Sequence, residues 1–333
     1  MLVPKTKYRW LQCFVVGVVL LLLPILIINL LIDPLWMLSG NRLEGKNFAW
    51  NERQAKVNRL ANGQVSMDCV VLGTSRSTLL SEHLINGGKT FNFAVSGASI
   101  PEYVQLAQHV KEQGYRPGKV IVEVSRGQLI GKPNTNDVNL QPSPLIPTSL
   151  SKGTFRFSLL TLLDSPPLPR FYDAEFQCGV LPNQSPYVPD RESGKQTPIS
   201  LKVDEPLATL CQLREVFPEA EFTAYLPPQC AFDQKRLFLR DPVRYAEIPQ
   251  SLVDVFGRVV DVSLPSSTTL DPANTYDGSH YYREVMDRVA KTLDGHPDPD
   301  LDAVIVTDDP DYSETIASRM ESVQFVLASV SGS

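Results

Sequence analysis

The sequence predicts an α/β protein in which helices cover both faces of a parallel sheet, preceded by one transmembrane helix. Three observations support this prediction: short continuous apolar runs, amphipathic segments that alternate with them, and one long uncharged run near the N-terminus. Strands that are buried on both faces read as continuous apolar runs, and their alternation with helices is typical of a parallel sheet.

The apolar runs and the segments between them give the order of the elements. Strands are expected over residues 67–73, 90–95, 119–125, 221–227 and 258–263. Pro101–Gly114 is expected to be a helix, because proline begins it, glycine ends it and its apolar residues recur at helical spacing. Further helices are expected over residues 77–85, within 242–256 and over 281–293. The tail contains a strand-like run, residues 302–306, and one helix.

The composition excludes some classes of partner. The chain has 333 residues, 43% hydrophobic and 20% charged, with a formal net charge of −6. Such a balance supports a sizeable core and argues against a nucleic-acid partner. The five cysteines form no CxxC pair, so neither a metal site nor a cofactor is expected. Whether Cys178, Cys211 and Cys230 include one disulfide stays open at this stage.

Residues 11–32 carry no charge, and only Gln12 and Asn29 among them are polar. About 20 such residues cross a bilayer as a helix. A secretory signal has a shorter apolar region of about 7–15 residues and a small-residue cleavage site, and the other alternative is a buried core helix. Lys5, Lys7 and Arg9 precede the run, which places the N-terminus in the cytoplasm. We therefore expect an uncleaved single-pass anchor with the main domain exported.

The chain is accordingly divided into five parts. These are a cytoplasmic N-terminus (residues 1–10), a transmembrane anchor (11–32), a juxtamembrane segment (33–66), a main domain (67–294) and a C-terminal extension of unclear role (295–333). Within the main domain, residues 131–200 are rich in Pro, Ser, Asn and Gln and are expected to be an insert. The insert is interpreted either as a lid or as an excursion without a role.

One histidine of the four is well placed for chemistry. His280 lies in the loop "YDGSHYY", which opens the last predicted helix, and Asp277 stands three residues before it. A serine becomes a good nucleophile when a histidine takes its proton, and a carboxylate orients that histidine. Ser75 follows the first predicted strand in "GTSRS". The carboxyl ends of parallel strands share one edge, so Ser75 and His280 can meet there.

Three blocks in this order resemble the SGNH/GDSL hydrolase superfamily. They are "GTSRS", "FNFAVSGAS" (residues 91–99) and "DGSHY". The chain is most similar to the membrane-anchored bacterial branch that includes alginate-type polysaccharide O-acetyltransferases and D-alanyl-transfer proteins. The resemblance covers about residues 70–293 without the insert. It implies a flavodoxin-like three-layer sandwich, an SGNH hydrolase-like fold, and a location in the bacterial inner membrane with the main domain in the periplasm or otherwise outside the cytoplasm.

The resemblance also implies roles for single residues. Ser75 corresponds to the nucleophile, His280 to the base and Asp277 to the residue that orients it. The backbone N–H groups of Ser75 and Gly97 correspond to the oxyanion hole. The family's third block normally supplies an asparagine, where this chain has "VEVSRGQL" (residues 122–129). Ser125, Arg126 or Gln128 replaces it, or the donor is absent.

The neighbours of these residues have weaker assignments. Thr74, Arg76, Asn92, Ser125 and Arg126 are expected to line the pocket or to support the site. Hydroxyl groups after a strand also cap helices, a loop glycine is common, and a DGSH turn often only precedes a helix. Asn92 is expected to pin its loop by hydrogen bonds, and Arg76 either supports the site or meets an anionic substrate.

The first functional hypothesis is an exported serine esterase or O-acyltransferase. Its substrate would be an acyl ester, most simply an acetyl ester, of a cell-envelope or secreted polysaccharide, and a membrane-bound protein would be a fitting acyl donor. The second hypothesis is a catalytically silent domain that binds a polymer or a partner within an export or modification assembly. A lipid esterase is a third interpretation, but no apolar surface motif beyond the anchor favours it.

Overall fold

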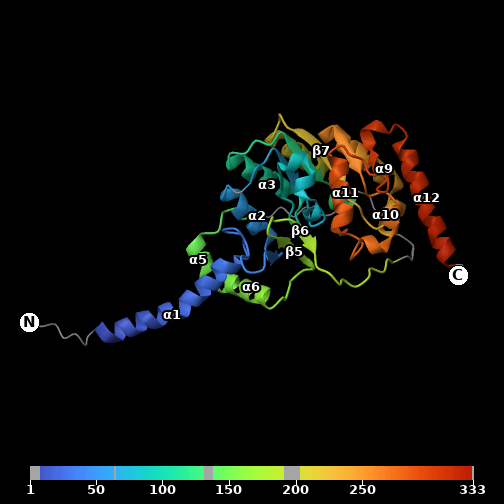
Figure 1. The fold of residues 1–333 in the computed structure, drawn as a ribbon. Coiled ribbons are helices and arrows are strands. Elements are labelled where there is room, and N and C mark those ends of the chain that lie inside the picture. Colours follow the sequence, from blue (N-terminus) through green and yellow to red (C-terminus); the bar gives the residue numbers. More distant parts are fainter. Residues whose placement is uncertain (1–7, 64, 131–137, 191–202, 332–333) are drawn as a thin grey trace, which may run out of the picture. The chain divides into compact units, whose positions relative to one another are not determined.

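The computed structural model describes residues 8–63, 65–130, 138–190 and 203–331, and the chain forms two compact units (Figure 1). Unit 1 comprises Met1–Gln64 and Gln141–Phe176, and unit 2 comprises Val65–Leu140 and Gln177–Ser333. The expected insert contributes residues 141–176 to unit 1 and residues 138–140 and 177–190 to unit 2. Its residues 131–137 and 191–200 lie outside the described part of the chain, as do residues 1–7 of the expected cytoplasmic N-terminus.

Unit 2 is built on a mostly parallel sheet, which confirms the predicted α/β class. The sheet contains β2 (Cys69–Leu72), β3 (Thr90–Asn92), β4 (Lys119–Glu123), β7 (Glu221–Leu226), β8 (Arg258–Asp261) and β9 (Val304–Ile305). Their order is β3-β2-β4-β7-β8-β9, and only β9 is antiparallel to its neighbour among these strands. The first five follow the flavodoxin-like order, in which the chain reverses direction next to the first strand. Val70 at the centre of β2 pairs with Phe91 and Val120, and all three are buried.

Helices cover both faces of this sheet (Figure 1). On one face α7 (Asp204–Val216) packs between α3 (Ile100–Glu112) and α9 (Pro242–Phe256). On the other face α11 (Arg283–Leu293) packs against the connection from β2 to β3. Because β3 and β4 lie on opposite sides of β2, the right-handed connection from β2 to β3 lies on the opposite face from the later connections. The remaining elements of unit 2 are η4 (Asn86–Gly88), α4 (Arg126–Ile130), β6 (Cys178–Val180), α8 (Ala231–Arg240), α10 (Ser267–Leu270), η5 (Pro272–Asn274), η6 (Val306–Asp308) and α12 (Tyr312–Ser331).

The segment over residues 77–85 differs from its prediction. It was expected to be a short helix, but it forms two 3-10 turns, η2 (Ser77–Leu79) and η3 (Glu82–Leu84). The reason is a side chain from β3: Asn92 Nδ2 donates to the carbonyls of Ser77 at 2.7 Å and Leu80 at 3.1 Å. Carbonyls that accept from a side chain are not extending an α-helix. The predicted pinning role of Asn92 agrees with these bonds.

The C-terminal extension belongs to unit 2. β9 pairs with β8, and α12 packs against α8 and α9. Tyr312 in the first turn of α12 donates its hydroxyl to Asp261 at the end of β8. The same hydroxyl accepts from Arg126 at 3.0 Å. The tail is therefore joined to the sheet by buried polar contacts.

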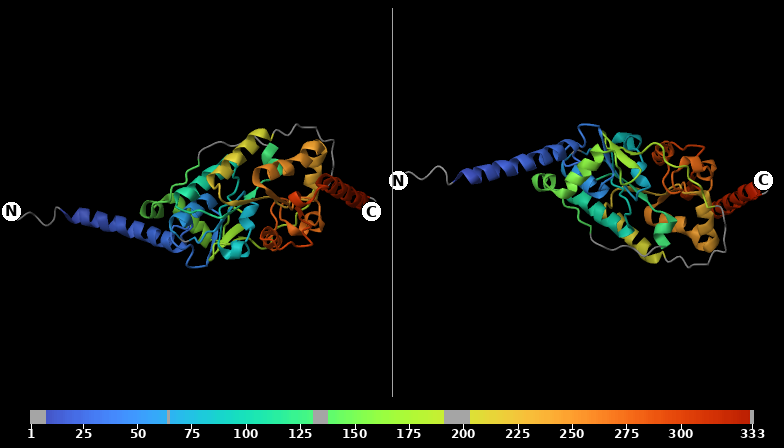
Figure 2. Two further views of the ribbon diagram at one scale, coloured as in Figure 1. Left: turned by 90° about the horizontal axis from the view of Figure 1, so that it is seen from above. Right: turned by 90° about the horizontal axis from the view of Figure 1, so that it is seen from below.

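Unit 1 contains the long N-terminal helix. Its elements are α1 (Arg9–Ile32), β1 (Lys46–Phe48), α2 (Glu52–Ala61), α5 (Leu145–Ser149), α6 (Lys152–Leu162) and β5 (Arg170–Asp173). β1 and β5 are antiparallel, with Asn47 opposite Tyr172. In Figures 1 and 2 the N-terminal turns of α1 extend beyond the rest of unit 1. Among the described residues α1 is the one helix long and apolar enough to cross a membrane. Its most apolar window is 11% buried, whereas a core helix is mostly buried.

The C-terminal end of α1 is built into unit 1. Asp33 follows the helix in a left-handed conformation, and its carboxyl group accepts the N–H groups of Met37 at 2.8 Å and Gly40 at 3.0 Å. Asn47 Nδ2 donates to the carbonyl of Ile32 at 3.1 Å. Trp36 is only 2% exposed and stands edge-on to Phe176 at 4.7 Å.

Candidate active site

The loop that carries Ser75 begins at the carboxyl end of β2, where Gly73 allows an unusually close approach. A Cβ atom at Gly73 would lie 2.5 Å from Ser77 Oγ and 2.8 Å from Glu123 Oε2. Real Cβ atoms do not tolerate such distances, so a residue without a side chain is needed here. The loop can therefore fold back tightly over the end of the neighbouring strand β4.

Glu123, at the end of β4, holds this loop in place by hydrogen bonds. Its fully buried carboxyl group accepts from Thr74 N at 2.8 Å and from Thr74 Oγ1 at 2.7 Å. It also accepts from Ser77 N at 3.2 Å and from the Ser77 hydroxyl, which in turn contacts the hydroxyl of Tyr225. Buried polar groups that are fully bonded in this way rigidify their surroundings. Glu123 is not among the residues predicted from the sequence, although a single carboxylate near the end of the apolar run "KVIVEV" is a signal for it.

The loop that carries His280 is a compact turn. Asp277 Oδ1 accepts the N–H groups of Ser279 at 2.9 Å and His280 at 2.8 Å. Gly278 between them has φ +82°, which glycine adopts without strain. The Thr275 hydroxyl donates to the His280 carbonyl at 2.7 Å and closes the turn. The D-x-x-H spacing therefore places the imidazole of His280 next to the carboxylate of Asp277.

The structure brings Ser75, His280 and Asp277 into one hydrogen-bonded series. His280 Nδ1 lies 2.7 Å from Asp277 Oδ2, and His280 Nε2 lies 2.7 Å from Ser75 Oγ. A nucleophile and its base are expected at about 2.6–3.2 Å. Because Nδ1 faces a carboxylate, we assign the ring proton to Nδ1, so that Nε2 accepts from the Ser75 hydroxyl. This arrangement can remove a proton from Ser75 and stabilise the imidazolium that forms.

The environment favours the charged form of Asp277. Partial burial raises the pKa of this carboxyl group, but the His280 hydrogen bond and charge and two backbone N–H groups outweigh it and lower the pKa below its ordinary value. The His280 side chain is 19% exposed and that of Asp277 is 41% exposed. Tyr276 stacks on the imidazole, with ring centroids 5.4 Å apart and planes at 7°. The ring of His280 is therefore held between its carboxylate, Ser75 and an aromatic face.

Arg76 connects the two loops. Its Nε donates to Ser279 Oγ at 3.0 Å, and its Nη1 lies 3.4 Å from Glu123 Oε1. The residue after Ser75 is thus bonded to the residue before His280. These contacts support the interpretation in which Arg76 supports the site.

Gly97 lies after β3 in the second block. It is exposed and has φ +70°, and within the described residues no atom beyond its chain neighbours lies within 4 Å of the position that a Cβ would take. Its backbone N–H as an oxyanion donor, together with that of Ser75, stays a prediction.

The three candidate replacements for the third-block asparagine make other hydrogen bonds. Ser125 donates both its N–H, at 2.9 Å, and its hydroxyl, at 3.2 Å, to Gln128 Oε1. Gln128 Nε2 donates to Tyr103 at 2.8 Å. Arg126 is 1% exposed and bonds Asp261 at 2.8 Å. Arg126 therefore belongs to a buried hydrogen-bond network with Asp261 and Tyr312, and its expected place at the pocket or in support of the site stays a prediction.

No group of three or more His, Cys, Asp or Glu side chains that could hold a metal ion occurs within the described ranges. All five cysteines lie in the described part of the chain, and none of them forms a disulfide bond there.

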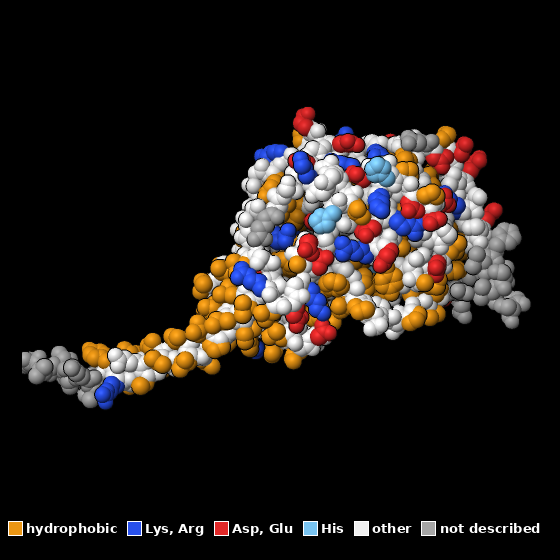
Figure 3. Space-filling model, viewed as in Figure 1, with side chains coloured by type: hydrophobic (Ala, Val, Ile, Leu, Met, Phe, Trp, Pro, Cys, Tyr) orange, Lys and Arg blue, Asp and Glu red, His pale blue; other side chains and the backbone are white. Residues whose placement is uncertain are grey.

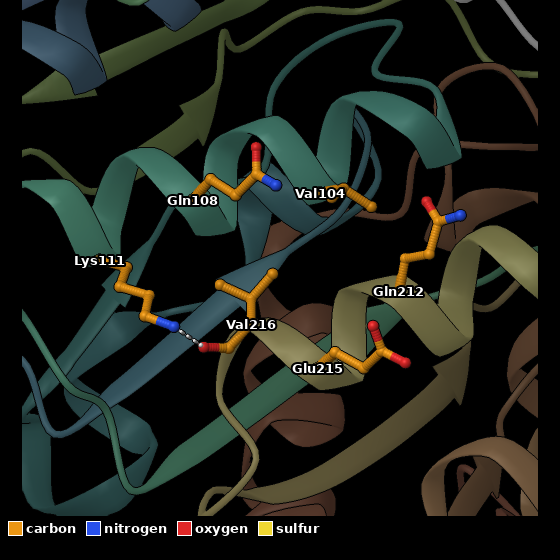
Figure 4. Close-up of a pocket in the computed structure, with 6 residues that line it drawn as sticks. All are labelled: Val104, Gln108, Lys111, Gln212, Glu215 and Val216. Atoms are coloured by element: carbon orange, nitrogen blue, oxygen red, sulfur yellow. Dashed lines mark hydrogen bonds between the residues drawn. The ribbon is translucent and has the colours of Figure 1, made fainter.

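A separate surface pocket lies between α3 and α7 (Figure 4). It is lined by Val104, Gln108, Lys111, Gln212, Glu215 and Val216. Lys111 Nζ donates across it to the Val216 carbonyl at 3.0 Å. Both helices run against the strand direction, so their last turns lie toward the amino ends of the strands, away from Ser75. The pocket is thus remote from the hydrogen-bonded series.

Fold and site together define a class: an α/β protein with a serine, a histidine and an aspartate in series at the carboxyl edge of a parallel sheet. Among solved structures, one described as "a putative platelet activating factor" from Streptococcus pneumonia is similar, with a TM-score of 0.40 and 11% identity over 74% of this chain and 90% of that chain. No family model and no curated protein matches the chain.

Proposed function

We propose that unit 2 is an exported serine esterase or O-acyltransferase of the SGNH type. The observation that supports this most is the series Asp277–His280–Ser75, with both contacts at 2.7 Å. A serine, an imidazole and a carboxylate in this order are the arrangement that activates a serine hydroxyl for attack on an acyl carbonyl. The hydrogen bonds of Glu123 and Arg76 hold the loops of Ser75 and His280 in position relative to each other.

The reaction would proceed in two steps, acylation of Ser75 and then transfer of the acyl group to an acceptor. His280 Nε2 takes the Ser75 proton while Oγ attacks the ester carbonyl, and the tetrahedral intermediate places its negative charge on the carbonyl oxygen. The intermediate collapses, His280 gives the proton to the leaving alcohol, and an acyl-Ser75 ester remains. Water or a sugar hydroxyl then attacks that ester, with its proton passing to His280, and Ser75 leaves with the proton returned. Backbone N–H groups of Ser75 and Gly97 would bind the oxyanion.

The substrate we propose is an acetylated cell-envelope or secreted polysaccharide. Two considerations support it: the resemblance of the three sequence blocks to polysaccharide O-acetyltransferases, and an anchor that would hold the enzyme at the cell envelope. A membrane-bound protein would be a fitting acyl donor for the transfer reaction. Hydrolysis and transfer use the same residues and differ in the acceptor of the acyl group.

The location we propose is the bacterial inner membrane, with α1 as an uncleaved anchor and the N-terminus in the cytoplasm. The end of α1 supports retention rather than cleavage, because Asn29 Nδ2 donates to the Ser149 carbonyl at 2.7 Å and Asn47 bonds the Ile32 carbonyl. Cleavage after the helix would remove partners on which unit 1 depends. Unit 2 would then lie in the periplasm.

A second candidate function is a silent scaffold that binds a polymer or a partner. The engagement of Ser125, Gln128 and Arg126 in other hydrogen bonds favours it, because a missing oxyanion donor costs about 10²–10³ in turnover.

Labelling with a fluorophosphonate probe separates the two candidates. The full chain in detergent should be labelled, and the label should vanish in Ser75→Ala. Ser267→Ala, which removes an exposed hydroxyl on α10, is the matched control and should label like the wild type. A folded wild-type protein that takes no label would favour the scaffold. Release of acetate from an acetylated polysaccharide, with and without a sugar acceptor, then distinguishes hydrolysis from transfer.

A further inference from the structure

Helix α6 in unit 1 buries its polar side and exposes its apolar side. Its fully buried positions carry small hydroxyl side chains, while leucines at its C-terminal end point outward. A helix on the surface of a soluble protein shows the opposite pattern. The buried residues are Thr154, Ser158 and Thr161, and the exposed ones are Leu159, Leu162 and the adjoining Leu163.

Specific contacts fix this orientation of α6. Trp50 Nε1 donates to Thr161 Oγ1 at 3.0 Å, and the Trp50 ring stacks on Phe157 at 5.0 Å. The Ser151 side chain caps the helix by accepting from Thr154 N. A rotation that turned the leucines inward would break these contacts, so their exposure is a property of the folded unit.

The exposed leucines belong to a larger apolar surface. Among the residues whose burial the structure describes, and outside α1 and its flanking Tyr8, eight exposed large hydrophobic residues lie in unit 1 and three lie in unit 2. Seven of the eight come from α5, α6 and the segments that follow each: Leu145, Ile146, Leu150, Leu159, Leu162, Leu163 and Leu168. We call these seven residues the α5–α6 surface. In Figure 3 hydrophobic side chains continue from α1 onto the adjoining part of unit 1.

The position of α5 and α6 along α1 gives the depth of this surface. α1 packs against both helices, and the contact lies in its last turns, where Asn29 bonds the Ser149 carbonyl. An apolar core of about 30 Å takes about 20 helical residues. Counted from Leu11, these end close to Asn29. The α5–α6 surface is therefore level with the end of the apolar span of α1.

Charges at the ends of α6 suit a membrane boundary. Lys152 and Arg156 are exposed at its N-terminal end, on the side of the helix that carries Leu159 and Leu163 further on. Asp164, next to Leu163, lies 3.3 Å from Lys46. Helices that lie in a bilayer interface combine an inserted apolar face with basic side chains near anionic headgroups. Small residues on the inner side and apolar residues on the outer side are likewise typical of helices that pack in lipid.

We propose that the α5–α6 surface lies in the lipid bilayer, in the leaflet reached by the C-terminal end of α1. This inference rests on the proposed anchoring by α1 and adds a second, in-plane contact with the same membrane. Unit 1 then contacts the membrane through both α1 and the α5–α6 surface, and its exposed leucines face lipid acyl chains and not water.

Photocrosslinking in the full chain tests this proposal. p-Benzoylphenylalanine replaces Leu163 in one variant and Leu159 in another, in vesicles of phosphatidylethanolamine and phosphatidylglycerol. A lipid adduct is expected at both positions. Replacement of Val16 in α1 reports on the anchor, and replacement of Val243, which is 69% exposed on unit 2, is the matched apolar control without an adduct. Unchanged thermal unfolding verifies that each variant is folded.

The outcomes separate this inference from the proposed anchor and the proposed chemistry. A lipid adduct at Val16 with none at Leu159 and Leu163 overturns the in-plane contact and leaves the anchor intact. Adducts between two protein chains at Leu163 overturn it in favour of a dimer interface. Loss of adducts at Val16 and Leu163 together overturns both membrane proposals. Labelling of Ser75 by fluorophosphonate is independent of each of these results.

Discussion

Ser75 Oγ lies 2.7 Å from His280 Nε2, although 205 positions separate the two residues in the chain. The contact arises because β2 and β8 are parallel strands of one sheet, so the loops that follow them leave at the same edge. Neither loop contributes its functional side chain to the hydrophobic core. Substitutions at these two residues should therefore change chemistry with little effect on folding.

Replacing the base tests this separation. His280→Ala should lower ester turnover by about 10²–10⁴-fold, the usual contribution of a general base. The melting temperature should stay nearly unchanged, since substitutions away from the core fall within about ±0.5 kcal/mol. Turnover of a chromogenic acetyl ester and thermal unfolding of the same preparation measure the two effects.

The matched control for this variant is His296→Ala, which removes an exposed histidine from the turn after α11. It should turn over ester like the wild type. If both histidine variants retain full activity, His280 has no part in the mechanism.

Glu123 offers a prediction about positioning. In Glu123→Gln one carboxyl oxygen becomes an NH₂ group, which cannot accept, so either the N–H groups of Thr74 and Ser77 or the Arg76 guanidinium loses its acceptor. A buried donor without a partner costs about 1–3 kcal/mol. The loop that carries Ser75 should shift, and a displacement of about 1 Å can lower kcat by about 10². Because Glu123 touches no substrate in the proposed mechanism, KM should change little.

Steady-state kinetics and urea unfolding check this expectation. Glu221→Gln, at the exposed start of the neighbouring strand β7, is the control with the same chemical change. A rise in KM at unchanged kcat would argue that Glu123 binds substrate and does not position Ser75.

The sequence predicted the parts of the molecule that depend on local pattern. The continuous apolar runs around Val70 and Val120 identified the strands, and the strand alternation identified a parallel sheet. The D-x-x-H spacing placed Asp277 next to His280 because four consecutive residues are enough to define that turn. Their partner Ser75 was found through its position after a strand.

Other features could not be predicted because they depend on distant contacts. Glu123 reads as an ordinary charged residue at a strand end until the loop of Ser77 folds over it. The partners of Arg126 in its buried network, Asp261 and Tyr312, lie far along the chain, so the sequence does not reveal them. The sequence gives no sign that Leu159 and Leu162 of α6 face outward, since this follows from the orientation that Trp50 fixes.

The buried pair of Arg126 and Asp261 gives a pH-dependent prediction. Burial raises the pKa of Asp261, but the Arg126 guanidinium and several hydrogen bonds outweigh it and hold the pKa below its ordinary value of 3.8. A carboxyl group with a lowered folded-state pKa stabilises the fold above its unfolded pKa and loses this contribution as the pH falls through the folded value. Asp261→Asn should cost about 3–5 kcal/mol at neutral pH, because Arg126 stays buried without its partner.

Urea unfolding at neutral pH and below pH about 4 measures this effect. The free energy of unfolding should fall more steeply with acid in the wild type than in Asp261→Asn. Asp254→Asn, an exposed position on α9, should follow the wild type at every pH. Parallel curves for Asp261→Asn and the wild type would contradict the role assigned to this pair.

Gly278 connects backbone conformation to the position of the base. It has φ +82°, and a Cβ atom there would lie 2.5 Å from the Tyr187 hydroxyl oxygen. Gly278→Ala should cost about 1–2 kcal/mol for the left-handed conformation alone. The contact with Tyr187 adds a displacement of the His280 loop, which should lower turnover by about 10².

Comparison with Gly257→Ala isolates the effect of the crowding by Tyr187, because Gly257→Ala has only the backbone strain. Gly257 ends α9 with the same φ of +82°, and in the described part of the chain no atom beyond its neighbours lies within 4 Å of the position that a Cβ would take. It should lose comparable stability and keep full ester turnover. Tyr187→Ala combined with Gly278→Ala removes the crowding and should recover part of the lost turnover, since only the backbone strain remains. Equal turnover in Gly278→Ala and Gly257→Ala would show that crowding by Tyr187 does not reach the imidazole.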